Sequence, residues 1–223
     1  MRPLWIGVAL MLLLGACAHS RAPKPPASPS SSTHGAAVNP ANIKRVVREL
    51  PPNSEVTTAI PGTASPRVIW SLGTDAAAKP AQCAALADPG NGHGGPAQGL
   101  SASGAGGIVD TIVVALPGPV GLDHNLVAAC GQWTMTSGHT TVGVHLTDAP
   151  HIEGAETLGM VADIKASVEA GTEIDSRACT FIAYLDGYYA FTTLITDPGS
   201  PLPALPPQFA ADLLVKTVST LRS

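Results

Sequence analysis

This sequence of 223 residues is poor in charged and aromatic side chains. Charged residues make up 13% of it, aromatic residues make up 4%, and the formal net charge is -4. Nucleic-acid-binding proteins concentrate Lys and Arg in a basic patch, and proteins that stack single-stranded bases expose aromatic rings. We therefore expect no nucleic-acid partner and no aromatic platform on which bases or sugars could stack.

Long apolar runs are also scarce, and the one that stands out lies at the N-terminus. Leu4 to Leu14 carries no charge and follows Arg2. It is too short to span a bilayer, which takes about 20 apolar residues, and its length suits the hydrophobic region of a secretory signal peptide. Small residues follow in the string Leu14-Gly15-Ala16-Cys17. This order predicts cleavage before Cys17, and the alternative is an ordinary signal peptide with a chance cysteine.

The string Leu14-Gly15-Ala16-Cys17 resembles the lipobox of bacterial lipoproteins. In that class the cysteine thiol receives diacylglycerol and becomes the first residue after cleavage. The resemblance implies that residues 1–16 are a lipoprotein signal peptide and that Cys17 is the lipidation site. The lipid would hold the protein on the extracytoplasmic side of the cell membrane without a transmembrane helix.

Residues 17–39 are rich in Pro, Ser and Ala and almost lack large apolar side chains. Such a segment cannot bury enough surface to offset its chain entropy, so we expect a disordered tether that stands the rest of the chain off the membrane. The remaining residues, 40–223, have a length that suits a single domain.

Cysteine is sparse, with four residues in the chain. If Cys17 carries lipid, then Cys83, Cys130 and Cys179 can form one bridge and leave one thiol. We favour Cys83–Cys130, because both lie near predicted helix ends beside Gly or Pro, where geometry is adjustable. Cys179 lies within a predicted strand near Phe181, which indicates a small buried apolar residue more than a reactive thiol.

Helical patterns occur at both ends of residues 40–223. Asn39-Pro40 is typical of a helix start, and the apolar residues of 43–50 recur at helical spacing. Further helices are expected over 80–86, 123–130 and 208–221.

Strand patterns fill the rest of the domain. An apolar run covers 108–116 and a short strand is expected within 54–60, while period-two alternation dominates after residue 133, with a hairpin signal at Asp186-Gly187. The predicted fold is α+β, an antiparallel sheet of about five to six strands that forms a meander in the C-terminal half, with helices packed on one face.

Two patterns suggest ligands and are better explained without them. Residues 90–95 match G-x-G-x-x-G, but prolines flank the match where a dinucleotide site needs a strand and a helix, so we expect a surface loop. His139, His145 and His151 lack the short spacing of metal ligands on one rigid element. We expect no metal site and no cofactor.

A serine triad cannot be judged from spacing, because triads are recognised by geometry. The available candidates are Ser101 or Ser103, His124 or His139, and Asp110 or Asp123. The chain contains enough Ser, His and Asp residues for such a set of candidates to arise by chance. We therefore expect no catalytic residues, and a cell-envelope serine hydrolase is the alternative.

Four residues are candidates for a ligand cleft. Asp110 interrupts an apolar strand, and a buried carboxylate needs a partner or water. Arg177, on another predicted strand, is the partner we favour. Trp133 and Tyr188 would line a cleft if both faced outward.

Four runs resemble those of an uncharacterised group of mycobacterial lipoproteins. They are Leu14-Gly15-Ala16-Cys17, Gln82-Cys83-Ala84-Ala85-Leu86, Ala129-Cys130-Gly131-Gln132-Trp133-Thr134 and Pro207-Gln208-Phe209-Ala210-Ala211-Asp212-Leu213-Leu214. More distantly, they are similar to the extracellular sensor domain of mycobacterial membrane serine/threonine kinases. The resemblance implies an extracytoplasmic α+β domain with a cleft and a ligand, and no catalysis. The kinase sensors resemble a two-disulfide pattern, whereas this chain has three cysteines besides Cys17, and these 223 residues show no kinase part.

These observations predict a lipid-anchored, non-catalytic binding domain, sensor-like in character. Its partner would be a small apolar ligand or an envelope protein. A pocket lined by Ile, Val and aromatic side chains would favour the ligand, and a flat polar sheet face would favour protein docking. A purely structural role in the envelope is a third possibility.

Overall fold

The computed structural model describes residues 37–168 and 171–223. The expected signal peptide, Cys17 and nearly all of the expected tether lie outside these ranges. The helices are η1 (Pro40–Glu49), α1 (Pro66–Ile69), η2 (Ala81–Ala87), α2 (His124–Ala129) and α3 (Pro207–Leu221), where η marks a 3-10 helix. The strands are β1 (Glu55–Thr57), β2 (Ala77–Lys79), β3 (Ala97–Gly104), β4 (Gly107–Ala115), β5 (Gln132–Ser137), β6 (Thr140–Thr147), β7 (Glu156–Ser167), β8 (Glu173–Leu185) and β9 (Tyr188–Thr196).

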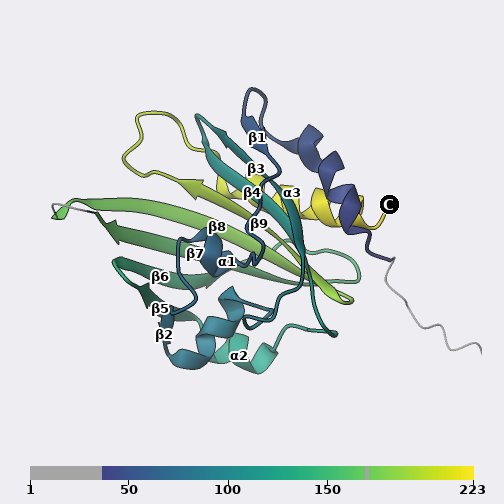
Figure 1. The fold of residues 1–223 in the computed structure, drawn as a ribbon, viewed down its shortest axis with the longest axis horizontal. Coiled ribbons are helices and arrows are strands. Elements are labelled where there is room, and N and C mark those ends of the chain that lie inside the picture. The colour runs from purple at the N-terminus through teal and green to yellow at the C-terminus, as the bar shows by residue number, and fades with distance from the viewer. Residues whose placement is uncertain (1–36, 169–170) are drawn as a thin grey trace, which may run out of the picture. The chain divides into compact units, whose positions relative to one another are not determined.

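All nine strands form one antiparallel sheet with the order β1-β3-β4-β9-β8-β7-β6-β5-β2 (Figure 1). The predicted α+β class and the meander from β5 to β9 are confirmed. The predicted number of strands is too low, because β2 and β3 were not expected. Ala, Gly and Ser dominate β3, so it lacks the β-branched and aromatic residues that mark a strand in a sequence.

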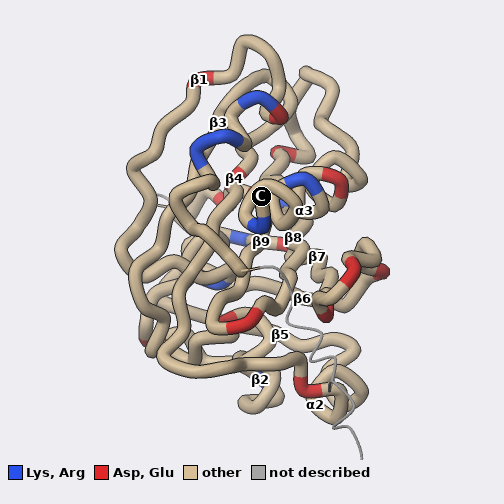
Figure 2. The backbone as a smooth tube through the Cα atoms, turned by 90° about the vertical axis from the view of Figure 1, so that its right-hand side faces the viewer, with Lys and Arg blue, Asp and Glu red and all other residues tan. Residues whose placement is uncertain are grey.

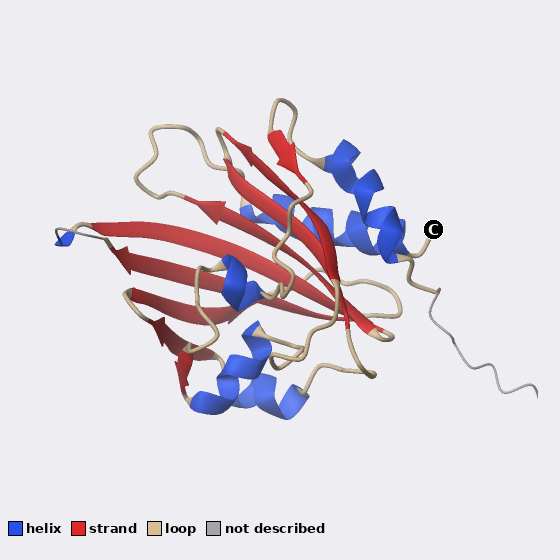
Figure 3. Ribbon diagram, viewed as in Figure 1, coloured by secondary structure: helices blue, strands red, loops and turns tan. Residues whose placement is uncertain are grey.

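Helices cover both faces of the sheet (Figure 3), so the prediction that they pack on one face is wrong. We call the two sides the α3 face, where α3 and η1 pack, and the disulfide face, where α1, η2 and α2 lie. Alternate residues of β8 enter different cores: Phe181 and Ala183 join the core under α3, and Ile182 and Tyr184 join the core under the other helices. A strand that is buried on both faces is apolar throughout and shows no alternation of polar and apolar residues. The sequence pattern therefore does not reveal that helices cover both faces of the sheet.

The Cys83–Cys130 disulfide is present, as predicted, with a Cα–Cα distance of 5.7 Å. It joins η2 to the residue that follows α2. Asp123 caps α2 by accepting hydrogen bonds from the backbone N–H groups of Asn125 and Leu126. This short helix is therefore held at both ends.

The first helix begins where the sequence predicts, with the Asn39 side chain accepting a hydrogen bond from the Ala41 N–H at 3.1 Å. It is wound as a 3-10 helix, and Ile43 and Val46 are its buried residues. Across 37–168 and 171–223, no helix combines the length and apolar character needed to cross a membrane.

One half of the α3 face is left uncovered. Helix α3 packs on β4, β8 and β9 and on η1, while β5, β6 and β7 lie beyond it. The side chains that these strands direct to this face include Thr134, Thr141, His145 and Lys165, which are exposed. The sheet therefore presents a hydrogen-bonding surface to solvent on rigid strands.

Candidate functional site

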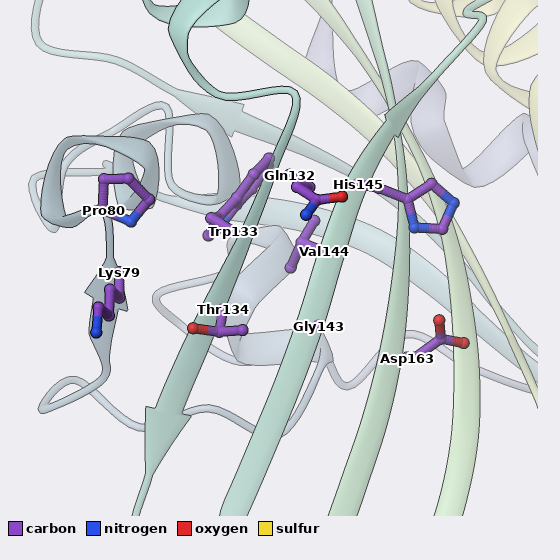
Figure 4. A pocket seen from close by; sticks show the side chains of 9 residues that line it. All are labelled: Lys79, Pro80, Gln132, Trp133, Thr134, Gly143, Val144, His145 and Asp163. Atoms are coloured by element: carbon purple, nitrogen blue, oxygen red, sulfur yellow. The ribbon is translucent and has the colours of Figure 1, made fainter.

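A pocket of about 570 Å³ opens on this uncovered half of the α3 face. It extends from the edge strand β2 across β5 and β6 to β7 (Figure 4). The residues that line it are Lys79, Pro80, Gln132, Trp133, Thr134, Gly143, Val144, His145 and Asp163. Its volume falls within the range of pockets that hold small molecules, about 300–1,000 Å³.

The strand register aligns five residues in a row across the pocket. Lys79 pairs with Thr134, Thr134 with Gly143, Gly143 with Asp163, and Asp163 with Arg177. Residues that pair across antiparallel strands point to the same face. The row therefore places an ammonium, a hydroxyl, a bare backbone position, a carboxylate and a guanidinium side by side.

A second row lies two residues further along β5 and β6, where Gln132 pairs with His145. Between these side chains and the first row, Gly143 forms the low point of the surface. A Cβ atom at Gly143 would meet no atom within 4 Å. The absence of a side chain there leaves the hollow, with an amide, an imidazole and a hydroxyl around it.

Charge is confined to the two ends of the first row. Neither β5 nor β6 contains Lys, Arg, Asp or Glu; Figure 2 shows the charged residues as separate short segments along a mostly uncharged chain. At one end, the Arg177 Nε donates to the Asp163 Oδ1 at 2.7 Å, with both side chains about half exposed. The hydrogen bond to Asp163 raises the pKa of Arg177. At the other end, Lys79 forms no salt bridge within the described residues.

Trp133 borders the pocket, but its side chain lies on the disulfide face of the sheet. Its side chain belongs to the core of the disulfide face and is 4% exposed, and in Figure 4 its ring lies behind β5 toward Pro80. The indole Nε1 is buried and has no hydrogen-bond partner among the described residues. An unpaired buried donor costs about 1–3 kcal/mol, so such a group calls for an explanation.

The four predicted cleft residues do not meet in one cleft. Trp133 and Asp110 point to the disulfide face, while Tyr188 and Arg177 point to the α3 face. The expected Asp110–Arg177 pair is wrong, because Arg177 pairs with Asp163. Burial raises the pKa of Asp110, and a hydrogen bond with Ser101, its cross-strand neighbour, lowers it in part.

The candidates for a serine triad are also dispersed. Ser101 lies on β3 beside Asp110, whereas His124 Nε2 lies 2.7 Å from Glu156 Oε1 at the start of β7. Strands β4, β9 and β8 separate β3 from β7. In the described ranges, no three His, Cys, Asp or Glu side chains are grouped so that they could hold a metal ion.

The remaining sequence candidates have structural roles. In the Gly-rich segment, the Gly92 N–H donates to Asp88 Oδ2, which also pairs with Arg67 at 3.0 Å. The segment leads into β3 and not into a helix. Cys179 is buried on β8, and burial raises the pKa of its thiol, so the thiol stays protonated.

Sequence reasoning missed Lys79, Gln132, Thr134, Gly143 and Asp163 as a group. The alternation of polar and apolar residues on β5 to β7 was available and assigns Gln132, Thr134, Gly143 and Asp163 to a face, whereas Lys79 lies on β2, which was not predicted. The pairing that brings them into rows was not available, since it depends on strand order and register.

Among curated proteins, no match is found. An uncharacterised protein from Mycobacterium smegmatis (Rv0999 ortholog) has a similar fold, with a TM-score of 0.60, 20% identity, and coverage of 83% of this chain and 98% of that one.

The extracellular domain of PknH from Mycobacterium tuberculosis also matches, with a TM-score of 0.39 and 14% identity over 82% of this chain and 91% of that one. The family described as a domain of unknown function, DUF5642, matches residues 39–222. The resemblance to an uncharacterised family that the sequence predicts is thus confirmed. The chain belongs to the DUF5642 family.

Proposed function

We propose that this protein is a lipid-anchored, extracytoplasmic binding domain without catalytic activity, and that the pocket over Gly143 is its binding site. The lipobox-like string at Cys17 supports the anchor. The Cys83–Cys130 disulfide supports the location, because disulfides persist in oxidising compartments outside the cytoplasm.

The observation that carries the binding function is the hydrogen-bonding row from Lys79 to Asp163. It is held on paired strands of a nine-stranded sheet, so the polar groups are positioned before any ligand arrives. Sites built on rigid elements lose less conformational freedom on binding.

The lining also narrows the class of ligand. From the sequence we expect a small apolar ligand or an envelope protein, but beside its apolar surface the pocket carries an ammonium, an amide, a hydroxyl, an imidazole and a carboxylate. These groups lose hydration if an apolar molecule covers them, and that loss is unfavourable. A polar ligand, or the polar surface of a protein, suits the pocket better.

Native mass spectrometry tests the proposal on full-length protein that is purified in mild detergent from the cell envelope. We expect a discrete mass excess under native over denaturing conditions, from a retained ligand or a co-purifying chain. The Gly143→Val variant should lose the excess, because a branched side chain fills the hollow where space is open.

The matched control is Thr141→Val, a near-isosteric change on the same face of β6 but outside the pocket lining. It should keep the excess. Equal native and denatured masses in the wild type, or an excess that survives Gly143→Val, would contradict the proposal.

A further inference from the structure

We infer that the ligand of the pocket over Gly143 is an anionic carbohydrate about two sugar rings long, an inference that rests on the proposed function. Three features of the lining lead to it: the uneven charge, the length of the row and the mixture of hydrogen-bonding groups.

The charge of the site is positive although the chain is negative overall. Asp163 is compensated by Arg177 at 2.7 Å, which leaves the ammonium of Lys79 without an ion pair at the opposite end. The formal net charge of the protein is -4. A local cation on a negative chain favours an anionic group, and a carboxylate or phosphate could accept hydrogen bonds from Lys79.

The row sets the length of the ligand. Lys79 and Asp163 lie on β2 and β7, which are three strand spacings apart in the order β7-β6-β5-β2. At roughly 4.8 Å per spacing, the two ends are about 14 Å apart. One sugar ring is too short to reach both ends, and a disaccharide is long enough.

Between the ends, the lining matches hydroxyl groups. Gln132 offers an amide, Thr134 a hydroxyl and His145 an imidazole, so donors and acceptors are interspersed. A sugar hydroxyl both donates and accepts, and can therefore bond to each of them. Gly143 leaves open space at the centre for a ring. Among the described lining residues, the one Phe, Tyr or Trp ring is that of Trp133, which is 4% exposed, so we expect recognition to rest on charge and hydrogen bonds.

The test is calorimetric titration of the full-length protein in detergent, at low salt and neutral pH, with two sugars that differ in one group. Cellobiouronic acid carries a carboxylate where cellobiose carries a hydroxymethyl group. We expect the acid to bind about fivefold more tightly, the effect of one exposed charge interaction.

Two variant pairs locate the effect. Lys79→Gln should abolish the preference for the acid, while Lys165→Gln, which removes an exposed lysine of β7 outside the lining, should keep it. Gly143→Val should weaken both sugars, and Thr141→Val neither.

Equal affinity of the two sugars for the wild type would overturn the inference and leave the proposed function standing. A preference that Lys165→Gln also abolishes would overturn it as a general charge effect. If neither sugar binds, the inference fails, and the native mass experiment decides separately whether the proposed function fails with it.

Discussion

Asp110 is a carboxylate in the middle of a strand that is largely apolar. It is 6% exposed, and burial raises its pKa from the ordinary value of 3.8, an effect that the hydrogen bond with Ser101 reduces. The folded chain therefore binds this proton more tightly than the unfolded chain. The free energy of unfolding should therefore fall as the pH rises from 3.8 through the folded-state pKa. Above that pKa, the contribution of Asp110 to the free energy of unfolding no longer changes with pH.

Asp110→Asn keeps a side chain that can hydrogen-bond Ser101 and removes the titration. We expect this variant to gain stability relative to the wild type as the pH rises from 4 to 7, measured by urea unfolding at each pH. The Ser101→Ala variant should lose stability more steeply than the wild type over the same pH range, because the hydrogen bond that lowers the pKa of Asp110 is removed. A stability difference between wild type and Asp110→Asn that does not change with pH would contradict the assignment of the raised pKa.

Gly107 opens β4 in a conformation that only glycine adopts easily. Its φ is +127°, and a Cβ atom there would lie 2.4 Å from the carbonyl oxygen of Ile195. We expect Gly107→Ala to lower the free energy of unfolding by about 2 kcal/mol or more, from backbone strain and the clash. Gly62→Ala is the control, since a Cβ at Gly62 meets nothing within 4 Å. Equal effects of the two changes on the urea midpoint would contradict this account.

At the scale of elements, the disulfide holds together the helices that cover the disulfide face. Cys83 and Cys130 are 47 residues apart and fully buried. By the chain-entropy argument, closing a loop of that length stabilises the fold by about 4 kcal/mol. The double variant Cys83→Ala/Cys130→Ala should lose about that amount in urea unfolding.

Two further comparisons isolate the bridge. Cys179→Ala, which removes a free buried thiol, should cost much less, because it leaves the cross-link intact. A reducing agent should lower the stability of the wild type and leave the double variant unchanged. Reduction that has no effect on the wild type would show that the bridge is absent in solution.

The elements that sequence reasoning located are those with local signals. Asp123 marks the start of α2 with its own side chain, and the Asp186-Gly187 turn, with Gly187 at a φ of +69°, joins β8 to β9. These features depend on a few neighbouring residues, so the sequence contains them.

The elements that were not predicted from the sequence depend on pairing with residues far away along the chain. Strand β2 is three residues long and exists through its pairing with β5. The pocket likewise arises from β2, β5, β6 and β7 lying side by side, and Asp163 could not be separated from other polar residues until its neighbours were known. The register between β7 and β8 places Arg177 opposite Asp163. Because this register was not known from the sequence, Asp110 was wrongly predicted as the partner of Arg177.

At the scale of the whole molecule, the anchor and the pocket make separate predictions. Cys17→Ser removes the thiol to which the lipid would attach. We expect the variant to move from the membrane fraction into the medium or the periplasm, while its disulfide and its binding are unchanged, as judged by fractionation and mass. A wild-type protein whose mature mass shows no acyl chains would contradict the anchor and leave the pocket unaffected.

The central claim is that the open half of the α3 face, over β5 to β7, is the binding surface. Hydrogen exchange tests it most directly, by comparing full-length protein as purified with the same protein unfolded, dialysed and refolded to remove any ligand. Removal of the ligand is predicted to speed amide exchange in residues 132–145 and around Asp163, and to leave β3 and β4 unchanged. Unchanged exchange over 132–145, or a change confined to the Arg67–Asp88 region on the opposite face, would contradict the claim.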